Sequence, residues 1–303
     1  MNEGKYVITG LGEVLWDVYP DKKYLGGAPA NAAIHASQLG AQGKIVSSVG
    51  DDPQGIALIE KLQLRGIDTS LIQVSKEHPT GSVQVNLDEK GVPRFVCSEN
   101  TAFDFLQWDS NMENCAKESH AVITGTLPQR NPAARKTIQK FLDAAEKNLI
   151  VYDVNLREWN KSVHSIVLET AQKSDILKLN ESECENLKEI LNRQNLNNTE
   201  FIEFLTDYFN LKMCALTLGP KGAILFNKHI VSKPALKINV KDTTGCGDAF
   251  TAAMCLSFLK NETPEQILDF SILVSSYTAT KVSAAPVYNQ DDIDGFREKI
   301  KNN

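Results

Sequence analysis

Near the C-terminus the sequence reads Asp242-Thr243-Thr244-Gly245-Cys246-Gly247-Asp248, followed by an apolar run over residues 249–259. The run predicts a buried helix, so a glycine-containing turn leads directly into a helix start that carries a carboxylate. Backbone N–H groups at a helix start lack intrahelical partners, and the helix dipole adds partial positive charge there. Because glycine lets the backbone approach an anion closely, the stretch predicts an anion-binding hole beside an acid.

Asp248 has two interpretations on this segment alone. An acid beside an anion hole can remove a proton from a nucleophile while negative charge on a transferring group is held nearby. Alternatively, Asp248 only caps the helix. Cys246 is expected to be a small residue tolerated between two glycines.

The bulk composition is that of a soluble globular protein. The chain has 303 residues, 42% of them hydrophobic and 23% charged, which is enough for a large buried core. The net charge of -6 argues against a nucleic-acid partner, which needs a basic face. It leaves ATP open as a ligand, because backbone amides and Mg²⁺ supply local positive potential.

Neither a signal peptide nor a membrane span is indicated. The N-terminal residues lead into a short apolar strand, and no apolar run approaches the roughly 18 residues that a membrane crossing needs. The six cysteines include no Cys-x-x-Cys pair, so neither a zinc ribbon nor a redox pair is expected. This cysteine usage is typical of a reducing cytoplasm.

Short apolar runs alternate with longer amphipathic stretches along the chain. We expect strands at residues 6–8, 45–46, 121–124, 149–152, 176–179, 213–217 and 223–226. We expect helices at residues 30–39, 54–65, 132–148, 181–193, 199–209 and 264–281. Several strand runs are apolar on both faces, as in a sheet that helices cover on both sides. The alternation predicts one α/β domain over residues 1–303 with a mostly parallel central sheet.

One region departs from this alternation. Residues 82–87 alternate polar and apolar, residues 88–91 supply a turn and residues 93–96 return, which predicts a hairpin. Residues 14–20 are also expected to form an exposed strand. We therefore expect a small antiparallel sheet, built from residues of about 13–30 and 78–105, that stands off the main domain. Such a sheet is suited to be a lid over a reacting centre or a dimer contact.

Three further motifs fall at the carboxyl ends of expected strands. They are Gly26-Gly27-Ala28-Pro29-Ala30-Asn31-Ala32-Ala33, Asn180-Glu181-Ser182-Glu183 and Thr217-Leu218-Gly219-Pro220-Lys221-Gly222. Open α/β sheets bind ligands in the crevice at that edge, so these motifs and residues 242–248 together predict one binding site. Asn180 and Glu183 also fit a purely structural capping box at a helix start.

Motifs for other chemistries are incomplete. Gly10-Leu11-Gly12 begins a dinucleotide fingerprint, but Leu15 stands at the position of the third glycine. The sequence contains neither a Walker-type phosphate loop nor a His/Cys cluster for a metal.

With this set of motifs the chain resembles the ribokinase-like (PfkB-type) carbohydrate kinases from end to end. Residues 26–33 resemble the family's N-terminal signature, residues 242–248 its C-terminal signature and residues 180–183 its Asn-x-x-Glu motif. The form Gly-Gly-Ala-Pro-Ala-Asn, with Asp153-Val154-Asn155-Leu156-Arg157 and Trp159, is most similar to fructokinases. Cys246 is a departure, because the family usually has alanine there. The resemblance implies a ribokinase-like α/β core with a small β lid.

The resemblance implies a role for each residue around the helix start. It makes Asp248 the general base, which accepts the proton of a sugar's primary hydroxyl as the γ-phosphoryl group leaves ATP. The backbone amides of Gly245, Cys246 and Gly247 would hold the developing charge.

The acceptor sugar would be held by residues from the N-terminal half. Asp17, Asn31 and the backbone of Gly27 would bind its hydroxyls by resemblance. Arg157 either reaches the substrate or pairs with a nearby acid, and both interpretations are open.

The resemblance also implies nucleotide and cation sites. Asn180 and Glu183 would organise Mg²⁺ and its waters near the phosphates. Asp242 and the carbonyl of Thr244 would bind a monovalent cation such as K⁺. Three residues would border the nucleotide: Thr217, Gly219 and Gly222.

The implied function is that of an ATP- and Mg²⁺-dependent sugar kinase, most similar to enzymes that phosphorylate fructose at the 6-hydroxyl. The alternatives are another acceptor, such as ribose, 2-keto-3-deoxygluconate or a nucleoside, or a sugar- or nucleotide-binding regulator without chemistry. The incomplete fingerprint disfavours a dehydrogenase. We expect a cytoplasmic protein that binds a sugar and ATP, binds neither nucleic acid nor membrane, and has a surface for a homodimer in the small sheet.

Overall fold

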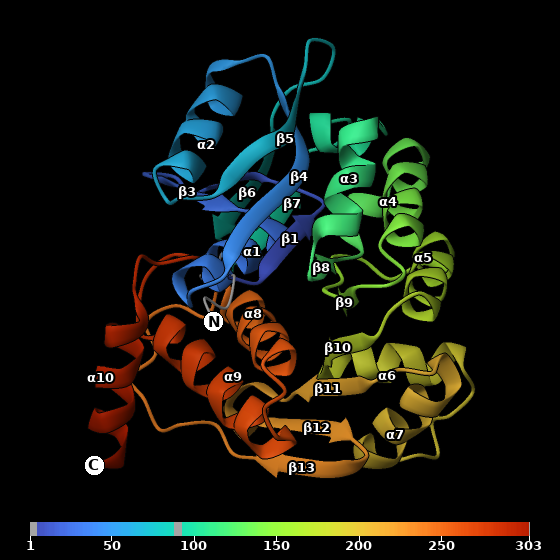
Figure 1. Ribbon diagram of the computed structural model, residues 1–303, viewed down its shortest axis with the longest axis vertical. Coiled ribbons are helices and arrows are strands. Elements are labelled where there is room, and N and C mark those ends of the chain that lie inside the picture. The colour runs from blue at the N-terminus through green and yellow to red at the C-terminus, as the bar shows by residue number, and fades with distance from the viewer. Residues whose placement is uncertain (1–4, 88–92, 303) are drawn as a thin grey trace.

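The central sheet runs through the whole molecule (Figure 1), whose computed structural model describes residues 5–87 and 93–302. Its nine strands lie in the order β13-β12-β11-β10-β9-β8-β1-β4-β5. Neighbouring strands from β5 to β11 pair in parallel, whereas β12 pairs antiparallel with both β11 and β13. Their bounds are β1 (Val7–Leu11), β4 (Gln42–Gly50), β5 (Asp68–Ser75), β8 (Ala121–Thr124), β9 (Leu149–Asp153), β10 (Ile176–Asn180), β11 (Met213–Thr217), β12 (Ala223–Asn227) and β13 (His229–Lys233). The predicted mostly parallel α/β sheet is confirmed.

Helices cover both faces of this sheet, as the doubly apolar strand runs predicted. Successive residues of β8 show the two faces, because Ile123 packs with α8 and α9 whereas Val122 packs with α3 and α4. One face carries α1 (Ala28–Gln38), α2 (Pro53–Gln63), α8 (Cys246–Leu259) and α9 (Pro264–Ala279), with α10 (Gln290–Lys301) against α9. The other face carries α3 (Ser110–Glu118), α4 (Pro132–Ala144), α5 (Lys161–Gln172), α6 (Glu181–Ile190) and α7 (Asn198–Phe209), shown in green to gold in Figure 1.

The strand order places a crevice at the carboxyl ends of β1 and β8. From β1 the chain continues to β4 and β5 on one side, whereas β8 begins the run to β13 on the other side. The connections that leave these two neighbouring strands therefore diverge. In open α/β sheets such a switch point opens a ligand crevice.

A second sheet, which we call the small sheet, has the order β3-β2-β6-β7. Its strands are β2 (Leu15–Val18), β3 (Lys23–Gly26), β6 (Gly81–Leu87) and β7 (Pro93–Cys97). The two hairpins β2–β3 and β6–β7 are antiparallel as expected, and they join through a parallel pair, β2–β6. The turn expected at residues 88–91 lies outside the described residues.

The expectation of an exposed strand at residues 14–20 is wrong in its first half. Leu15 and Trp16 are 2% and 1% exposed. The indole N–H of Trp16 donates to the carbonyl of Gln54 at 3.0 Å, and its ring joins the core between α1 and α2. Burial of the large ring outweighs the polar residues that follow it in the sequence.

Some elements were absent from the expectation, and four predicted helices extended two or more residues beyond the observed end. The missed elements are β5, β13, α3, α5 and α10. The polar helix α10 buries only Ile293, which leaves little pattern to find. By contrast, α5 buries Val163, Ile166 and Val167 at helical spacing, a signal that was present in the sequence but overlooked. The helices expected to end at residues 65, 148, 193 and 281 end at Gln63, Ala144, Ile190 and Ala279.

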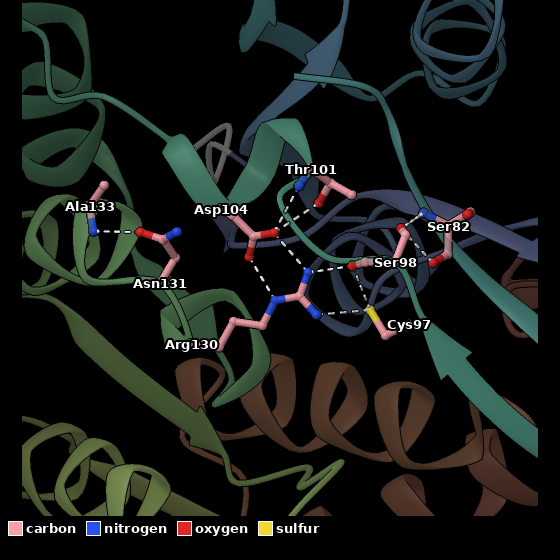
Figure 2. Close-up of polar contacts among 8 residues, drawn as sticks. All are labelled: Ser82, Cys97, Ser98, Thr101, Asp104, Arg130, Asn131 and Ala133. Carbon is pink, nitrogen blue, oxygen red and sulfur yellow. Dashed lines mark hydrogen bonds and ion pairs between the residues drawn. The ribbon is translucent and has the colours of Figure 1, made fainter. Parts of the chain in front are cut away.

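The root of the small sheet is fastened to the core by Arg130 (Figure 2). Arg130 follows a short 3₁₀ turn (Leu127–Gln129) after β8, and its guanidinium makes a two-pronged pair with the buried Asp104 carboxylate at 2.7 Å. The same group donates to the carbonyl of Ser98 at 2.5 Å and to the sulfur of Cys97 at 3.3 Å. Asp104 in turn accepts from the backbone and hydroxyl of Thr101. One cation thus joins β7, the segment that follows it and the central sheet.

We expect Arg130→Met to lower the free energy of unfolding by about 3–5 kcal/mol, because the change leaves a buried carboxylate without its cation. Urea denaturation measures this loss. Lys117→Met is the matched control, since the Lys117–Glu113 pair is exposed and such pairs contribute at most about 1 kcal/mol. Equal, small losses in both variants would show that the Arg130 pair does not fasten the sheet.

Candidate active site

A cleft of about 530 Å³ opens at the carboxyl ends of β1, β8 and β9, between the small sheet and the start of α8. This volume lies within the range of small-molecule sites. Most of the residues expected to bind the sugar or the transferring group line it: Asp17, Gly27, Asn31, Arg157, Gly245, Gly247 and Asp248. Thr244, expected at the cation site, also lines the cleft, whereas Cys246 does not. Residues of two of the four motifs, 26–33 and 242–248, therefore meet in one cleft although they are far apart in the sequence.

The backbone at Gly245 sets the start of α8. Gly245 is the N-cap residue, with a left-handed φ of 76°. A Cβ at this position would lie 2.0 Å from the carbonyl oxygen of Ala284, so only glycine fits. Asp248 is consequently the third residue of the helix, and the interpretation of Asp248 as its N-cap is wrong.

Asp248 is held as a buried acceptor at the floor of the cleft. Its side chain is 9% exposed, and its Oδ2 accepts from the amide Nδ2 of Asn31 at 2.8 Å. Burial, together with the nearby Asp153 carboxylate, raises the pKa of Asp248 to about 6 against the opposing effects of Asn31, Lys178 and Arg157. A carboxyl group with this pKa is ionised at neutral pH and basic enough to accept a proton.

The backbone around Asp248 offers donors to an anion. The N–H groups of Gly245, Gly247 and Asp248 have no hydrogen-bond partner among the described residues. The N–H of Cys246 is already engaged, because it donates to the carbonyl of Thr243 at 3.2 Å. The helix start therefore presents unpaired donors and the positive end of the α8 dipole at one place.

Glu13 is a residue of the cleft that sequence analysis missed. It follows β1 and is 2% exposed, and its Oε1 accepts from the N–H of Ala28 at the start of α1 at 3.0 Å. Its Oε2 and the Oδ1 of Asn31 are buried without a partner among the described residues. Unpaired buried acceptors are costly, so both atoms fit a ligand that donates hydroxyl hydrogens.

Asp17, Arg157 and Gly27 are the other residues of the cleft that were expected to bind the sugar. Burial raises the pKa of Asp17 to about 6, with Arg157 opposing the shift and Asp242 adding to it. Arg157 is exposed at the cleft, and no ion pair between it and an acid occurs among the described residues. Gly27, with a φ of 104°, has no room for a Cβ beside the carbonyl of Glu13.

Lys178 and Asp153 form a buried ion pair that sequence analysis also missed. The Nζ of Lys178 donates to both carboxylate oxygens of Asp153 at 3.0 and 2.9 Å, and the hydroxyl of Thr251 donates to Oδ2 at 2.8 Å. The pair joins β9, β10 and α8. A signal was present, since Lys178 is a lone cation in the apolar run of β10.

The expected nucleotide and Mg²⁺ residues lie beyond the residues that line the cleft. Asn180 and Glu183 form a capping box at the start of α6, with hydrogen bonds of 2.8 and 3.0 Å. The second oxygen of Glu183 accepts from the N–H of Leu156 at 2.8 Å. Both oxygens are thus engaged, so Glu183 fits contact with Mg²⁺ through water better than direct ligation. Within residues 5–87 and 93–302 no three His, Cys, Asp or Glu residues are grouped to hold a metal.

Thr217, Gly219 and Gly222 continue this edge. Thr217 pairs with Asn180 across β10 and β11, so the two expected motifs are neighbours. Gly219 and Gly222 have φ values of 57° and 106°, and a Cβ at Gly222 would lie 2.0 Å from the carbonyl of Lys233. The turn after β11 therefore requires glycine at Gly222.

Asp242 ties the loop before α8 to a second loop. Its Oδ1 accepts from the N–H of Thr244 at 2.9 Å, and its Oδ2 accepts from the N–H of Ser283 at 3.3 Å. A cation bound by Asp242 and the carbonyl of Thr244 would therefore lie next to the loop at residues 282–288.

A comparison with protein families finds a match to the pfkB family carbohydrate kinases over residues 12–290. The sugar kinase PH1459 of Pyrococcus horikoshii is 32% identical over 94% of this chain and 90% of its own length. An ATP-dependent 6-phosphofructokinase of Thermoanaerobacterium thermosaccharolyticum is 30% identical over 98% and 94%. Fructokinase-2 of Solanum lycopersicum is 27% identical over 92% of each chain.

Solved structures share the fold. The complex of PH1459 with ATP superposes with a TM-score of 0.79, at 27% identity, over 96% of this chain and 99% of that chain. A ribokinase of Thermotoga maritima superposes with a TM-score of 0.80, at 22% identity, over 97% and 99%. The ribokinase-like fold expected from the sequence is confirmed. No helix within the described residues has the length and apolar character needed to cross a bilayer.

The cleft acids give a prediction for pH-dependent stability, and Glu13 is its clearest case. Burial raises the pKa of Glu13 from 4.5 to about 7. A raised folded pKa means that the stability contributed by neutral Glu13 is complete below pH 4.5 and is lost as pH rises through 7. A glutamine side chain cannot ionise, so we expect Glu13→Gln to gain roughly 3 kcal/mol relative to the wild type between these pH values.

Urea denaturation at several pH values measures this difference. Glu203→Gln, an exposed position on α7, is the control, and its difference from the wild type should stay flat. A flat difference for Glu13→Gln would mean that Glu13 is not buried as an acid.

Proposed function

The chain belongs to the pfkB family of carbohydrate kinases, and we propose that it transfers the γ-phosphoryl group of ATP to the primary hydroxyl of a sugar, D-fructose, giving fructose 6-phosphate. The family and the ATP-dependent sugar-kinase activity follow from the match over residues 12–290 and from the relatives. The choice of fructose and the residue roles are our proposal.

One observation carries the mechanism: the buried Asp248 carboxylate shares its cleft with unpaired N–H donors at the start of α8. In the proposed step the acceptor hydroxyl oxygen attacks Pγ and forms the new O–P bond. The bond from Pγ to the β–γ bridging oxygen breaks, and its electron pair leaves with ADP. Asp248 accepts the hydroxyl proton, while the N–H groups of Gly245 and Gly247 face the charge on the transferring group.

A neutral polyol fits the acceptor end of the cleft. Glu13 and Asn31 offer unpaired acceptors there, and Asp17 adds a carboxylate. A phosphorylated acceptor, as the name of the 6-phosphofructokinase relative indicates for that enzyme, would bring about two more negative charges. Two described cations line the cleft, and Lys178 lies against Gly247 at the start of α8, which leaves Arg157 for the acceptor end. This balance supports a neutral sugar, and the fructokinase relatives and the Gly-Gly-Ala-Pro-Ala-Asn motif support fructose.

We also propose binding sites for the two cations expected from the sequence, Mg²⁺ and K⁺. Mg²⁺ bound with ATP would shield phosphate charge, and Glu183 and Asn180 would hold its waters. K⁺ would bind at Asp242 and the carbonyl of Thr244, close to the anion-binding helix start.

Replacing K⁺ by tetramethylammonium should lower kcat, and unchanged kcat would exclude this site.

The small sheet covers one side of the cleft, since Asp17 and Val83 belong to its strands and line the cleft. We propose that it acts as a lid over the sugar, within a single kinase domain, and that its edges are the surface for a homodimer. The cysteines of the described residues are all free, which supports a reducing, cytoplasmic location.

A coupled assay of ADP release across a panel of acceptors tests the proposal. The panel contains fructose, fructose 6-phosphate, ribose, 2-keto-3-deoxygluconate and a nucleoside. The highest kcat/KM should be found with fructose. Turnover of another acceptor alone would refute fructose, and no turnover at all would favour a binding protein without chemistry.

We expect Asp248→Asn to fold normally and to lose roughly two to four decades of kcat, because the amide cannot accept the proton. Circular dichroism and thermal unfolding check the fold, and the coupled assay measures kcat. A variant with near-normal kcat would remove Asp248 from the mechanism.

We expect Asp17→Ala to raise KM for the sugar by about 10-fold or more, with little change in KM for ATP, because a hydrogen bond from a sugar hydroxyl to a carboxylate is lost. Asp21→Ala is the control, since Asp21 is exposed in the turn between β2 and β3. A defect confined to ATP would contradict the role of Asp17 in sugar binding.

A further inference from the structure

The cleft contains a buried cation that the mechanism above leaves without a task. Lys178 is 5% exposed, lies in β10 and lines the cleft. An ammonium group has three N–H donors, and the two hydrogen bonds of Lys178 both go to Asp153. At least one donor therefore remains for a ligand in the cleft.

The ammonium of Lys178 lies next to the start of α8, where unpaired N–H groups could bind an anion. A Cβ built on Gly247 would lie 3.0 Å from the Nζ of Lys178. The N–H of Gly247 has no partner among the described residues. A side-chain cation and the positive end of a helix thus face the same small volume, which is next to Asp248.

A purely structural ion pair is the alternative, and Lys188 shows what such a lysine looks like here. Lys188 is 4% exposed, as deeply buried as Lys178, and its Nζ donates to Glu185 and Asn198 at 2.8 Å. Lys188 does not line the cleft. Lys178 differs in that its ammonium faces an open volume that also receives unpaired backbone donors.

We propose that Lys178 is a catalytic residue of the phosphoryl transfer, whose ammonium contacts the transferring group beside Gly247 and stabilises the negative charge on it. The inference rests on the proposed function. Lys178 remains protonated throughout: the acceptor proton goes to Asp248, the new O–P bond forms as the Pγ–O bond to ADP breaks, and the lysine only neutralises charge. Asp153, held by Thr251, is the residue that positions the ammonium.

Lys178 and Asp153 have opposite effects on the pKa of the proposed base, Asp248. The groups that face Asp248 are Asn31 from α1, Asp153 from β9, Arg157 after β9, Lys178 from β10 and Glu13 after β1. Asp153 raises the pKa of Asp248, whereas Lys178 lowers it. Removal of Lys178 should therefore raise the pKa of the base, and neutralisation of Asp153 should lower it.

The test compares Lys178→Met, Asp153→Asn and the control Lys188→Met in the full-length enzyme. Lys178→Met should lose about 10²–10³-fold in kcat, the usual effect of removing a group that stabilises transition-state charge, while Lys188→Met keeps wild-type kcat. The acid limb of the kcat/KM profile should move to higher pH in Lys178→Met and to lower pH in Asp153→Asn, by about one unit in each case.

Binding gives a second readout without turnover. Calorimetry should show that Lys178→Met loses more affinity for a non-hydrolysable ATP analogue than for ADP, since the γ-phosphate lies beside the ammonium. Equal losses for the two nucleotides, acid limbs that shift in the same direction, or a kcat within about threefold of Lys188→Met would each overturn the proposal.

Two further variants keep the result interpretable. Lys178→Met leaves Asp153 buried without a cation, so the double variant Lys178→Met/Asp153→Asn, which has neither charge, replaces it if the single variant does not fold; its kcat should also be low. If the wild-type enzyme turns over none of the acceptors in the panel, the proposed function itself fails. If Asp248→Asn is inactive while Lys178→Met is active, only the role of Lys178 fails.

Discussion

The close contact between Gly245 and the carbonyl of Ala284 is the constraint on which the site depends. Only glycine fits this contact, and its left-handed φ turns the chain so that α8 begins with unpaired N–H donors at the cleft. The loop on the other side of this contact is held by α1, because His35 hydrogen bonds to the carbonyl of Ala284 at 3.0 Å and to the hydroxyl of Tyr288 at 2.8 Å. Burial lowers the pKa of His35 to about 4, so the ring stays neutral and keeps this geometry. Asn31, one helical turn before His35, grips Asp248 from the same helix.

The parts of the fold that were predictable are those that local physics determines. The runs at residues 121–124 and 213–217 match β8 and β11 at both ends, because short apolar segments buried on two faces stop abruptly at polar residues. The polar helix α10 and the edge strand β5 have no comparable pattern. Their places depend on packing against distant segments, as when α10 contributes Ile293 to the core beside α9.

The residues of the candidate site likewise divide into those that local sequence reveals and those that depend on distant neighbours. Residues in glycine-rich motifs, such as Asp248 and Asn31, could be found because the backbone geometry leaves a mark in the sequence. Glu13 and Lys178 could not, since their roles arise from neighbours far away in the chain: Glu13 from the start of α1, Lys178 from Asp153 and Gly247. The capping box of Asn180 and Glu183 shows a further difficulty, because one pattern satisfies a helix start and fits a role beside phosphate as well.

The attachment of Arg130 has a mechanical consequence. The Arg130 guanidinium holds the carbonyl of Ser98 and the Asp104 carboxylate together. The small sheet is therefore fixed to the core at the end of β7. Bending is then concentrated along the free length of its strands, away from this attachment. A closing movement would therefore displace β2 and β3, which Arg130 does not contact, farther than Cys97, which lies against the guanidinium.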